Sequence, residues 1–150
     1  MTTTNLEVID LTPRIGSEIR TDLDTLLSGR AAATIREILE QRGVVFFRGL
    51  DIGDEQQVAI ARTLGTVVQN EGENGIYKIS LDETVNQRAQ YLKGSLFWHF
   101  DGSLQPYPNL ATLLRAVRLS PTGGQTELCN TYAAYEDLPP ADKELIADLR

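Results

Sequence analysis

Histidine and cysteine are almost absent from this chain of 150 residues, which contains one of each, His99 and Cys129. A single cysteine excludes an internal disulfide framework and fits a reducing cytoplasm, the location we expect. Basic residues are also scarce, because 14 lysines and arginines stand against 21 acidic residues and leave a formal net charge of −7. This negative charge argues against nucleic acids and anionic membranes as partners. No apolar run is long enough to span a membrane.

The one histidine lies near the end of an aromatic-rich run, Leu96 to Asp101 (LFWHFD), two positions before an aspartate. In a β-strand, residues i and i+2 point to the same face, so the His99 imidazole and the Asp101 carboxylate would project side by side. Two histidines and one carboxylate, with the other positions open, form the non-haem Fe(II) oxygenase site. This chain supplies two of these three ligands and has no second histidine.

Spacing alone does not establish a metal site, because 21 acidic residues in 150 place an acid two positions after one histidine in seven. The alternative is a structural His99–Asp101 pair on a half-buried strand. A hydrolytic triad of His99, Asp101 and Ser103 is disfavoured, because all three would share one face of one strand, whereas a triad histidine lies between the serine and the aspartate. Taken alone, Thr126 is an ordinary β-residue after a turn, and Cys129 is a small core residue.

Hydrophobic periodicity predicts an α+β domain whose β part is incomplete. Asp54 is expected to be a helix N-cap, with Gln57 completing a capping box, and Gly43 is expected to end the preceding helix. The helices are expected at 31–42, 54–64, 131–138 and from Pro139-Pro140 onward. The strands are expected at 6–11, 16–20, 44–47, 76–81, 95–101, 110–119 and 125–129.

Four stretches, in matching order and spacing, resemble the N-terminal half of the taurine dioxygenase/dichlorophenoxyacetate dioxygenase (TauD/TfdA) family of Fe(II)- and α-ketoglutarate-dependent dioxygenases. They are an early core strand at Val44–Gly49, the W-H-x-D motif ending at Asp101, the P-x-G-G-x-T turn at Pro121–Thr126, and an A-A-Y…L-P helix beginning at Ala133. The last helix reaches residue 150 without a stop signal. We therefore expect residues 1–150 to be the N-terminal part of a single domain that continues beyond residue 150.

The resemblance implies a double-stranded β-helix, or jelly-roll, core with flanking helices, incomplete in this chain. It implies that His99 and Asp101 are metal ligands for Fe(II), and that Thr126 donates its hydroxyl to a carboxylate of the cosubstrate α-ketoglutarate. The family's third ligand, a histidine, and its α-ketoglutarate-binding arginine would both lie past Arg150. The fragment alone is therefore expected to be inactive.

The implied reaction hydroxylates a small anionic organic substrate with O₂ and decarboxylates α-ketoglutarate to succinate. Taurine is disfavoured as the substrate, because Gln69–Glu71 lacks the histidine that taurine-specific members carry in this loop. Ser80–Asp82 and Thr126–Cys129 look closer to the phenoxyacetate-degrading branch. The competing hypothesis is a non-catalytic binding or assembly protein on the same fold, and a homo-oligomer stays open as a partner.

Overall fold

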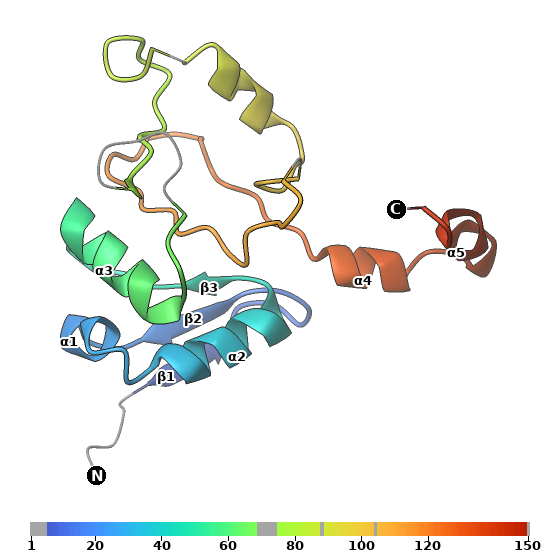
Figure 1. Ribbon diagram of the computed structural model, residues 1–150, viewed down its shortest axis with the longest axis horizontal. Helices are drawn as coiled ribbons and strands as arrows, with labels where there is room; N and C mark the ends of the chain where they lie inside the picture. Colours follow the sequence, from blue (N-terminus) through green and yellow to red (C-terminus); the bar gives the residue numbers. More distant parts are fainter. Residues whose placement is uncertain (1–5, 69–74, 88, 104, 150) are drawn as a thin grey trace. The chain divides into compact units, whose positions relative to one another are not determined.

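The computed structural model describes residues 6–68, 75–87, 89–103 and 105–149 (Figure 1). The chain forms two compact units, residues 1–51 with 119–150, and residues 52–118. Along the chain the elements are β1 (Glu7–Asp10), β2 (Ser17–Arg20), α1 (Leu23–Leu27), α2 (Ala32–Arg42), β3 (Val45–Phe46), α3 (Asp54–Leu64), the 3₁₀ helix η2 (Tyr91–Leu96), α4 (Thr131–Glu136) and α5 (Pro140–Ile146). Among the described residues, every helix is too short or too polar to cross a membrane.

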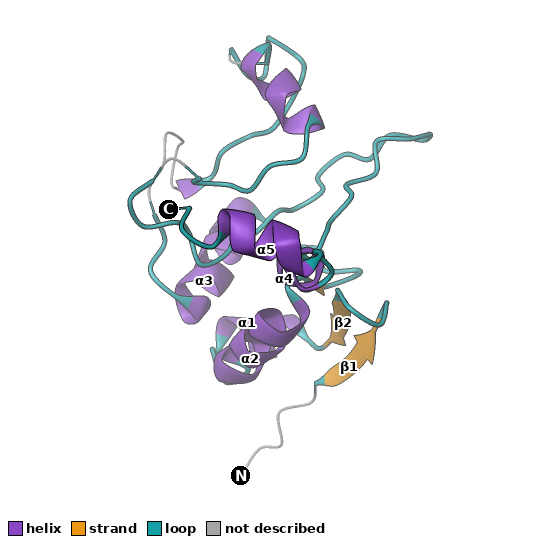
Figure 2. Cartoon of the chain, turned by 90° about the vertical axis from the view of Figure 1, so that its right-hand side faces the viewer, coloured by secondary structure: helices purple, strands orange, loops and turns teal. Residues whose placement is uncertain are grey.

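The first unit contains a three-stranded sheet in the order β1-β2-β3. The predicted hairpin of the first two strands is confirmed: they are antiparallel, with Glu7 opposite Arg20 and Asp10 opposite Ser17 (Figure 2). β3 pairs with β2 in parallel. Gly16 has a φ of +83°, and an added Cβ would lie 3.5 Å from the Phe46 ring. Glycine therefore suits the point where the hairpin turns back beneath an aromatic side chain.

Helix α2 begins one residue later than predicted and ends where expected. Gly43 adopts the left-handed conformation with φ of +68°, and its N–H donates to the Leu39 carbonyl at 2.7 Å. This is the terminating geometry that glycine makes accessible at a helix C-terminus. The buried apolar residues of this unit are Ile19, Leu26, Ala31 and Ile35. They come from β2, α1 and the start of α2, so the core of this unit lies between its sheet and its first two helices.

Helix α3 occupies the predicted residues of the second unit, but the expected cap is wrong. Gly53 is the N-cap, and its N–H donates to Gln56 Oε1 at 2.8 Å. Asp54 instead binds the Arg115 guanidinium, and Gln57 Nε2 donates to the Leu113 carbonyl at 3.1 Å. Both polar side chains of the predicted capping box are therefore used to hold the 110–119 segment. Local sequence does not reveal that competition, because Leu113 and Arg115 lie more than fifty residues away.

Four of the predicted strands, at 76–81, 95–101, 110–119 and 125–129, are wrong, because the described residues of these segments form no strand. The strand at 44–47 shortens to β3, whose two residues are half-buried. Alternating apolar residues form a strand only when a neighbouring strand supplies hydrogen-bond partners. Within the described part of the chain no segment pairs with them, and their apolar side chains lie open, with Val117 79% and Leu119 78% exposed.

The mixed sheet and its helices support an α+β fold, whereas the described residues do not show a jelly roll. The helices predicted near the C-terminus are confirmed as α4 and α5. Asn130 caps α4 by accepting a hydrogen bond from the Ala133 N–H at 3.0 Å, and Pro140 occupies the first turn of α5. Both are favoured residues at helix starts. Leu145 and Leu149 are 80% and 75% exposed.

Candidate metal and cosubstrate site

The His99–Asp101 pair forms in the second unit, directly after η2. Phe97, the C-cap of η2, is extended, and the chain turns at Asp101–Ser103. Gly102 has a φ of +76°, and an added Cβ would lie 3.4 Å from Asn109 Nδ2. His99 Nε2 and Asp101 Oδ1 are 3.6 Å apart, and both side chains are about half exposed. The predicted juxtaposition is therefore present, but a turn produces it in place of the predicted strand.

The imidazole of His99 is oriented by its own backbone. Its Nδ1 lies 2.7 Å from the Phe97 carbonyl oxygen. A carbonyl can only accept a hydrogen bond, so Nδ1 carries the proton in this contact and Nε2 of the neutral ring holds the free lone pair. Metal-binding histidines commonly show this arrangement, in which the second ring nitrogen donates to a backbone carbonyl. The lone pair and the Asp101 carboxylate are thus adjacent donors.

The donor set fits a divalent transition metal in part. Two donors 3.6 Å apart can both bind one ion, because the sum of two bonds of about 2.1 Å exceeds that separation. Among the described residues, no group of three His, Cys, Asp or Glu side chains could hold a metal. The Asp82 carboxylate accepts hydrogen bonds from the hydroxyl and the N–H of Thr84, and these bonds lower the pKa of its carboxyl. His99 and Asp101 therefore make up an incomplete site.

His99 and Asp101 lie together in one unit, and Thr126 belongs to the other unit. It lies in an exposed loop, between the turn at Gly123-Gly124, where both φ angles are positive, and the α4 cap Asn130. The glycine turn agrees with the sequence prediction, whereas the β-strand after it is wrong. The segment Gln69–Glu71, whose lack of a histidine argues against taurine, lies outside the described residues.

The aromatic residues around the pair are open to solvent. Phe97, Trp98 and Phe100 are 76%, 67% and 66% exposed. The half-buried strand on which the alternative places the pair does not form, because the described residues supply no apolar layer over this run. Large apolar side chains grouped on a surface commonly mark a face that contacts another molecule or polypeptide.

Sequence reasoning missed two arginines, Arg115 and Arg14, that join distant segments within the two units. In the second unit, Arg115 binds the Ile52 carbonyl and Asp54 at the start of α3, and its side chain is 23% exposed. In the first unit, Arg14 contacts α4. Neither is assigned a role from the sequence, and each bridges segments at least 60 residues apart. Only their charge distinguishes them in the sequence.

The chain matches the family model described as taurine catabolism dioxygenase TauD, TfdA family, over residues 7–150. It is 31% identical over 140 residues to the α-ketoglutarate-dependent 2,4-dichlorophenoxyacetate dioxygenase of Cupriavidus pinatubonensis, covering 79% of this chain and 47% of that protein. It is 34% identical over 147 residues to the α-ketoglutarate-dependent sulfate ester dioxygenase of Pseudomonas putida, covering 93% of this chain and 46% of that protein.

A solved structure is also similar: AAD-2 in complex with Mn(II) and N-oxalylglycine, with a TM-score of 0.69 and 25% identity. The match covers 96% of this chain and 50% of that one. The protein is therefore a member of the TauD/TfdA dioxygenase family. The chain spans about half the length of the relatives that it matches.

Proposed function

We propose that a protein carrying this chain is an Fe(II)- and α-ketoglutarate-dependent dioxygenase. It hydroxylates a small anionic organic substrate with O₂ and converts α-ketoglutarate to succinate and CO₂. The observation that carries the proposal is the His99–Asp101 pair, whose donor atoms lie 3.6 Å apart. The contact of Nδ1 with the Phe97 carbonyl leaves the lone pair of Nε2 available to a metal. Family membership supplies the reaction type, and residues 1–150 would be the N-terminal part of one catalytic domain.

Each residue of the candidate site has a distinct role in this proposal. His99 Nε2 and Asp101 Oδ1 hold the metal, and the Phe97 carbonyl keeps the imidazole in the tautomer that can bind it. Iron bound there would supply the redox chemistry that activates O₂. The Thr126 hydroxyl donates to a carboxylate of α-ketoglutarate, which orients the cosubstrate. Two relatives support the anionic substrate class, because their names give a phenoxyacetate and sulfate esters as substrates.

The test measures succinate release by a full-length protein that carries this chain. The assay contains Fe(II), α-ketoglutarate and a panel of phenoxyacetates, alkyl sulfates and taurine. We expect at least one aryloxy acid or sulfate ester to support turnover and taurine to support little. His99→Ala and Asp101→Asn should each lower succinate release at least a hundredfold. Ser103→Ala, two residues beyond the pair and exposed, should retain activity within twofold. Absence of turnover across the whole panel would refute the enzyme proposal.

A non-catalytic binding or assembly protein is the second candidate. The observation in its favour is that the described residues hold two metal donors and no third. Isothermal titration with N-oxalylglycine and Mn(II) separates the two functions. The enzyme proposal requires binding that His99→Ala abolishes together with succinate release, whereas a binding protein would release no succinate under any condition of the panel.

A further inference from the structure

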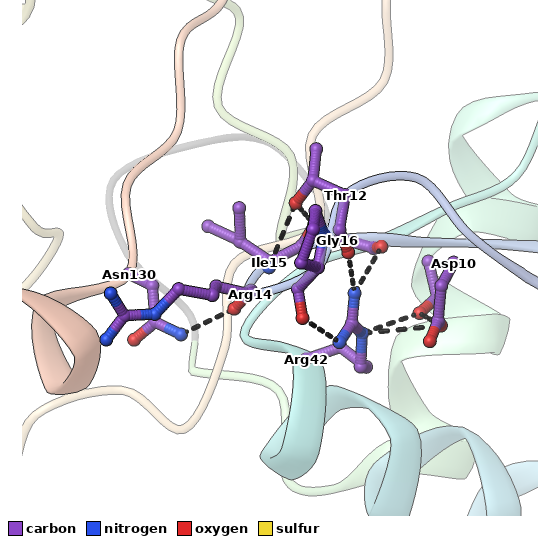
Figure 3. Close-up of polar contacts among 9 residues, drawn as sticks. Asp10, Thr12, Arg14, Ile15, Gly16, Arg42 and Asn130 are labelled. Atoms are coloured by element: carbon purple, nitrogen blue, oxygen red, sulfur yellow. Dashed lines mark hydrogen bonds and ion pairs between the residues drawn. The ribbon is translucent and has the colours of Figure 1, made fainter.

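Helix α4 is held at both ends by one residue of the β1–β2 hairpin. Asn130 Nδ2 donates to the Arg14 carbonyl at 2.7 Å (Figure 3). Asn130 Oδ1 caps the helix by accepting from the Ala133 N–H. The Arg14 guanidinium donates to the Ala133 carbonyl at 3.2 Å and to the Asp137 carboxylate at 2.6 Å. Arg14 thus reaches the first and the last turn of a helix that lies more than a hundred residues later in the chain.

The hairpin tip that carries Arg14 is itself held in place. The Arg42 guanidinium, at the end of α2, donates to the carbonyls of Thr12, Pro13 and Gly16 (Figure 3). The Thr12 hydroxyl also donates to the Ile15 carbonyl and accepts from the Ile15 N–H. These contacts leave the tip few alternative conformations, so Arg14 is presented from a fixed support.

The segment that carries Thr126 has little support of its own. Within the described part of the chain, the backbone of residues 123–129 makes no hydrogen bond. The segment begins at a turn with two glycines of positive φ and ends at Asn130. Thr126 lies four residues before Asn130, at most about 14 Å along an extended chain. Its position therefore depends strongly on where Asn130 is held.

We propose that Arg14 is a positioning residue for the α-ketoglutarate site, acting through Asn130 and α4 on the segment that carries Thr126. This inference rests on the proposed role of Thr126. Arg14 touches neither cosubstrate nor metal in this scheme. Its effect is to order the Thr126 segment before α-ketoglutarate binds, which removes an entropic cost from binding. Loss of the contact should therefore weaken cosubstrate binding and spare the chemical step.

The kinetic test uses two variants that each remove one contact in the protein at the full length of its relatives. Arg14→Ala removes the guanidinium, and Asn130→Asp keeps a helix cap but no longer donates to the Arg14 carbonyl. Each should raise the KM for α-ketoglutarate by about three- to tenfold, the effect of one or two ordinary hydrogen bonds, with kcat within twofold. Arg14→Lys, which can still pair with Asp137, should restore part of the affinity.

Arg20→Ala is the matched control, because Arg20 is a surface arginine of the same hairpin that pairs with Glu18 and Glu7. It should leave the KM for α-ketoglutarate unchanged, with all variants showing the circular dichroism spectrum of the parent. An unchanged KM in Arg14→Ala, or a loss confined to kcat, would overturn the inference.

A second measurement reports on the segment without activity. The sequence predicts Cys129 to be a small core residue, but this prediction is wrong, because the residue is exposed. A spin label on Cys129, with any further cysteine of the full-length protein replaced by serine, therefore reports the motion of residues 126–130. We expect Arg14→Ala and Asn130→Asp to sharpen the spectrum and Arg20→Ala to leave it unchanged; unchanged spectra in the first two variants would overturn the anchor. If Thr126→Val leaves the KM unchanged while the label still responds, the anchor stands and the role of Thr126 fails.

Discussion

Replacing Arg42 by methionine should destabilise the first unit, because its side chain joins the end of α2 to the β1–β2 hairpin. The Arg42 side chain is 16% exposed and forms an ion pair with Asp10 at 3.3 Å. It donates to three carbonyls of the hairpin tip and, at 3.1 Å, to the hydroxyl of buried Ser17. Hydrogen bonds from a charged donor contribute about 1.5–3 kcal/mol each, but carbonyls at the tip regain water. We therefore expect a net loss of about 2–4 kcal/mol.

Urea unfolding of the full-length protein followed by far-UV circular dichroism measures this loss. Arg42→Lys keeps the charge but offers no planar fork, so it should recover less than half of the lost free energy. Because the tip also carries Arg14, Arg42→Met should raise the KM for α-ketoglutarate as Arg14→Ala does. A change in unfolding free energy below about 0.5 kcal/mol, the range of ordinary surface substitutions, would refute the view that Arg42 organises the hairpin.

Three further outcomes are expected. Ile35→Ala, in the core, should lower the free energy of unfolding by about 2–4 kcal/mol, whereas Ile79→Ala, 62% exposed, should change it little in the same urea titration. The hydrogen bond from the Thr25 N–H lowers the pKa of the Asp22 carboxyl in the folded state. The stability that this carboxylate contributes is therefore present above its unfolded pKa and is lost as pH falls through the lower folded pKa. Asp22→Asn should flatten the dependence of unfolding free energy on pH below about pH 4. Residues 1–150 expressed alone should self-associate in light scattering and release no succinate, because their exposed apolar side chains favour association; a monomer would contradict this.

Helix ends show what could be predicted from the sequence. Gly43 ends α2 as expected because a left-handed C-terminal residue is a purely local requirement. The same local rule predicts Asp54 as the N-cap of α3, but its carboxylate binds Arg115, and Gly53 is the N-cap. A carboxylate at a helix start can satisfy either the helix or a distant cation, and residues nearby in sequence do not decide between them.

The strand predictions were wrong for a related reason. The alternation at 76–81 and 110–119 is compatible with strands, but a strand needs a partner that periodicity does not identify. β1 pairs with β2 because the two strands are only seven residues apart in the sequence. β3 must pair with β2 across the intervening helices α1 and α2, and only two residues of the predicted 44–47 strand do so. Arg115 and Gln57 secure part of the 110–119 segment to α3 by side-chain contacts alone. The segment therefore keeps a defined path without belonging to a sheet.

The two parts of the candidate site differ in the same way. The orientation of His99 is set by residues two positions away, the Phe97 carbonyl on one side and Asp101 on the other. Its donor pair could therefore be predicted from spacing, even though a turn replaced the strand. Thr126 has no such local support, and its nearest anchor, Asn130, is held by Arg14 from the other end of the chain. It follows that substitutions far from Thr126 in sequence should alter cosubstrate affinity, whereas the metal pair should respond chiefly to changes between Phe97 and Gly102.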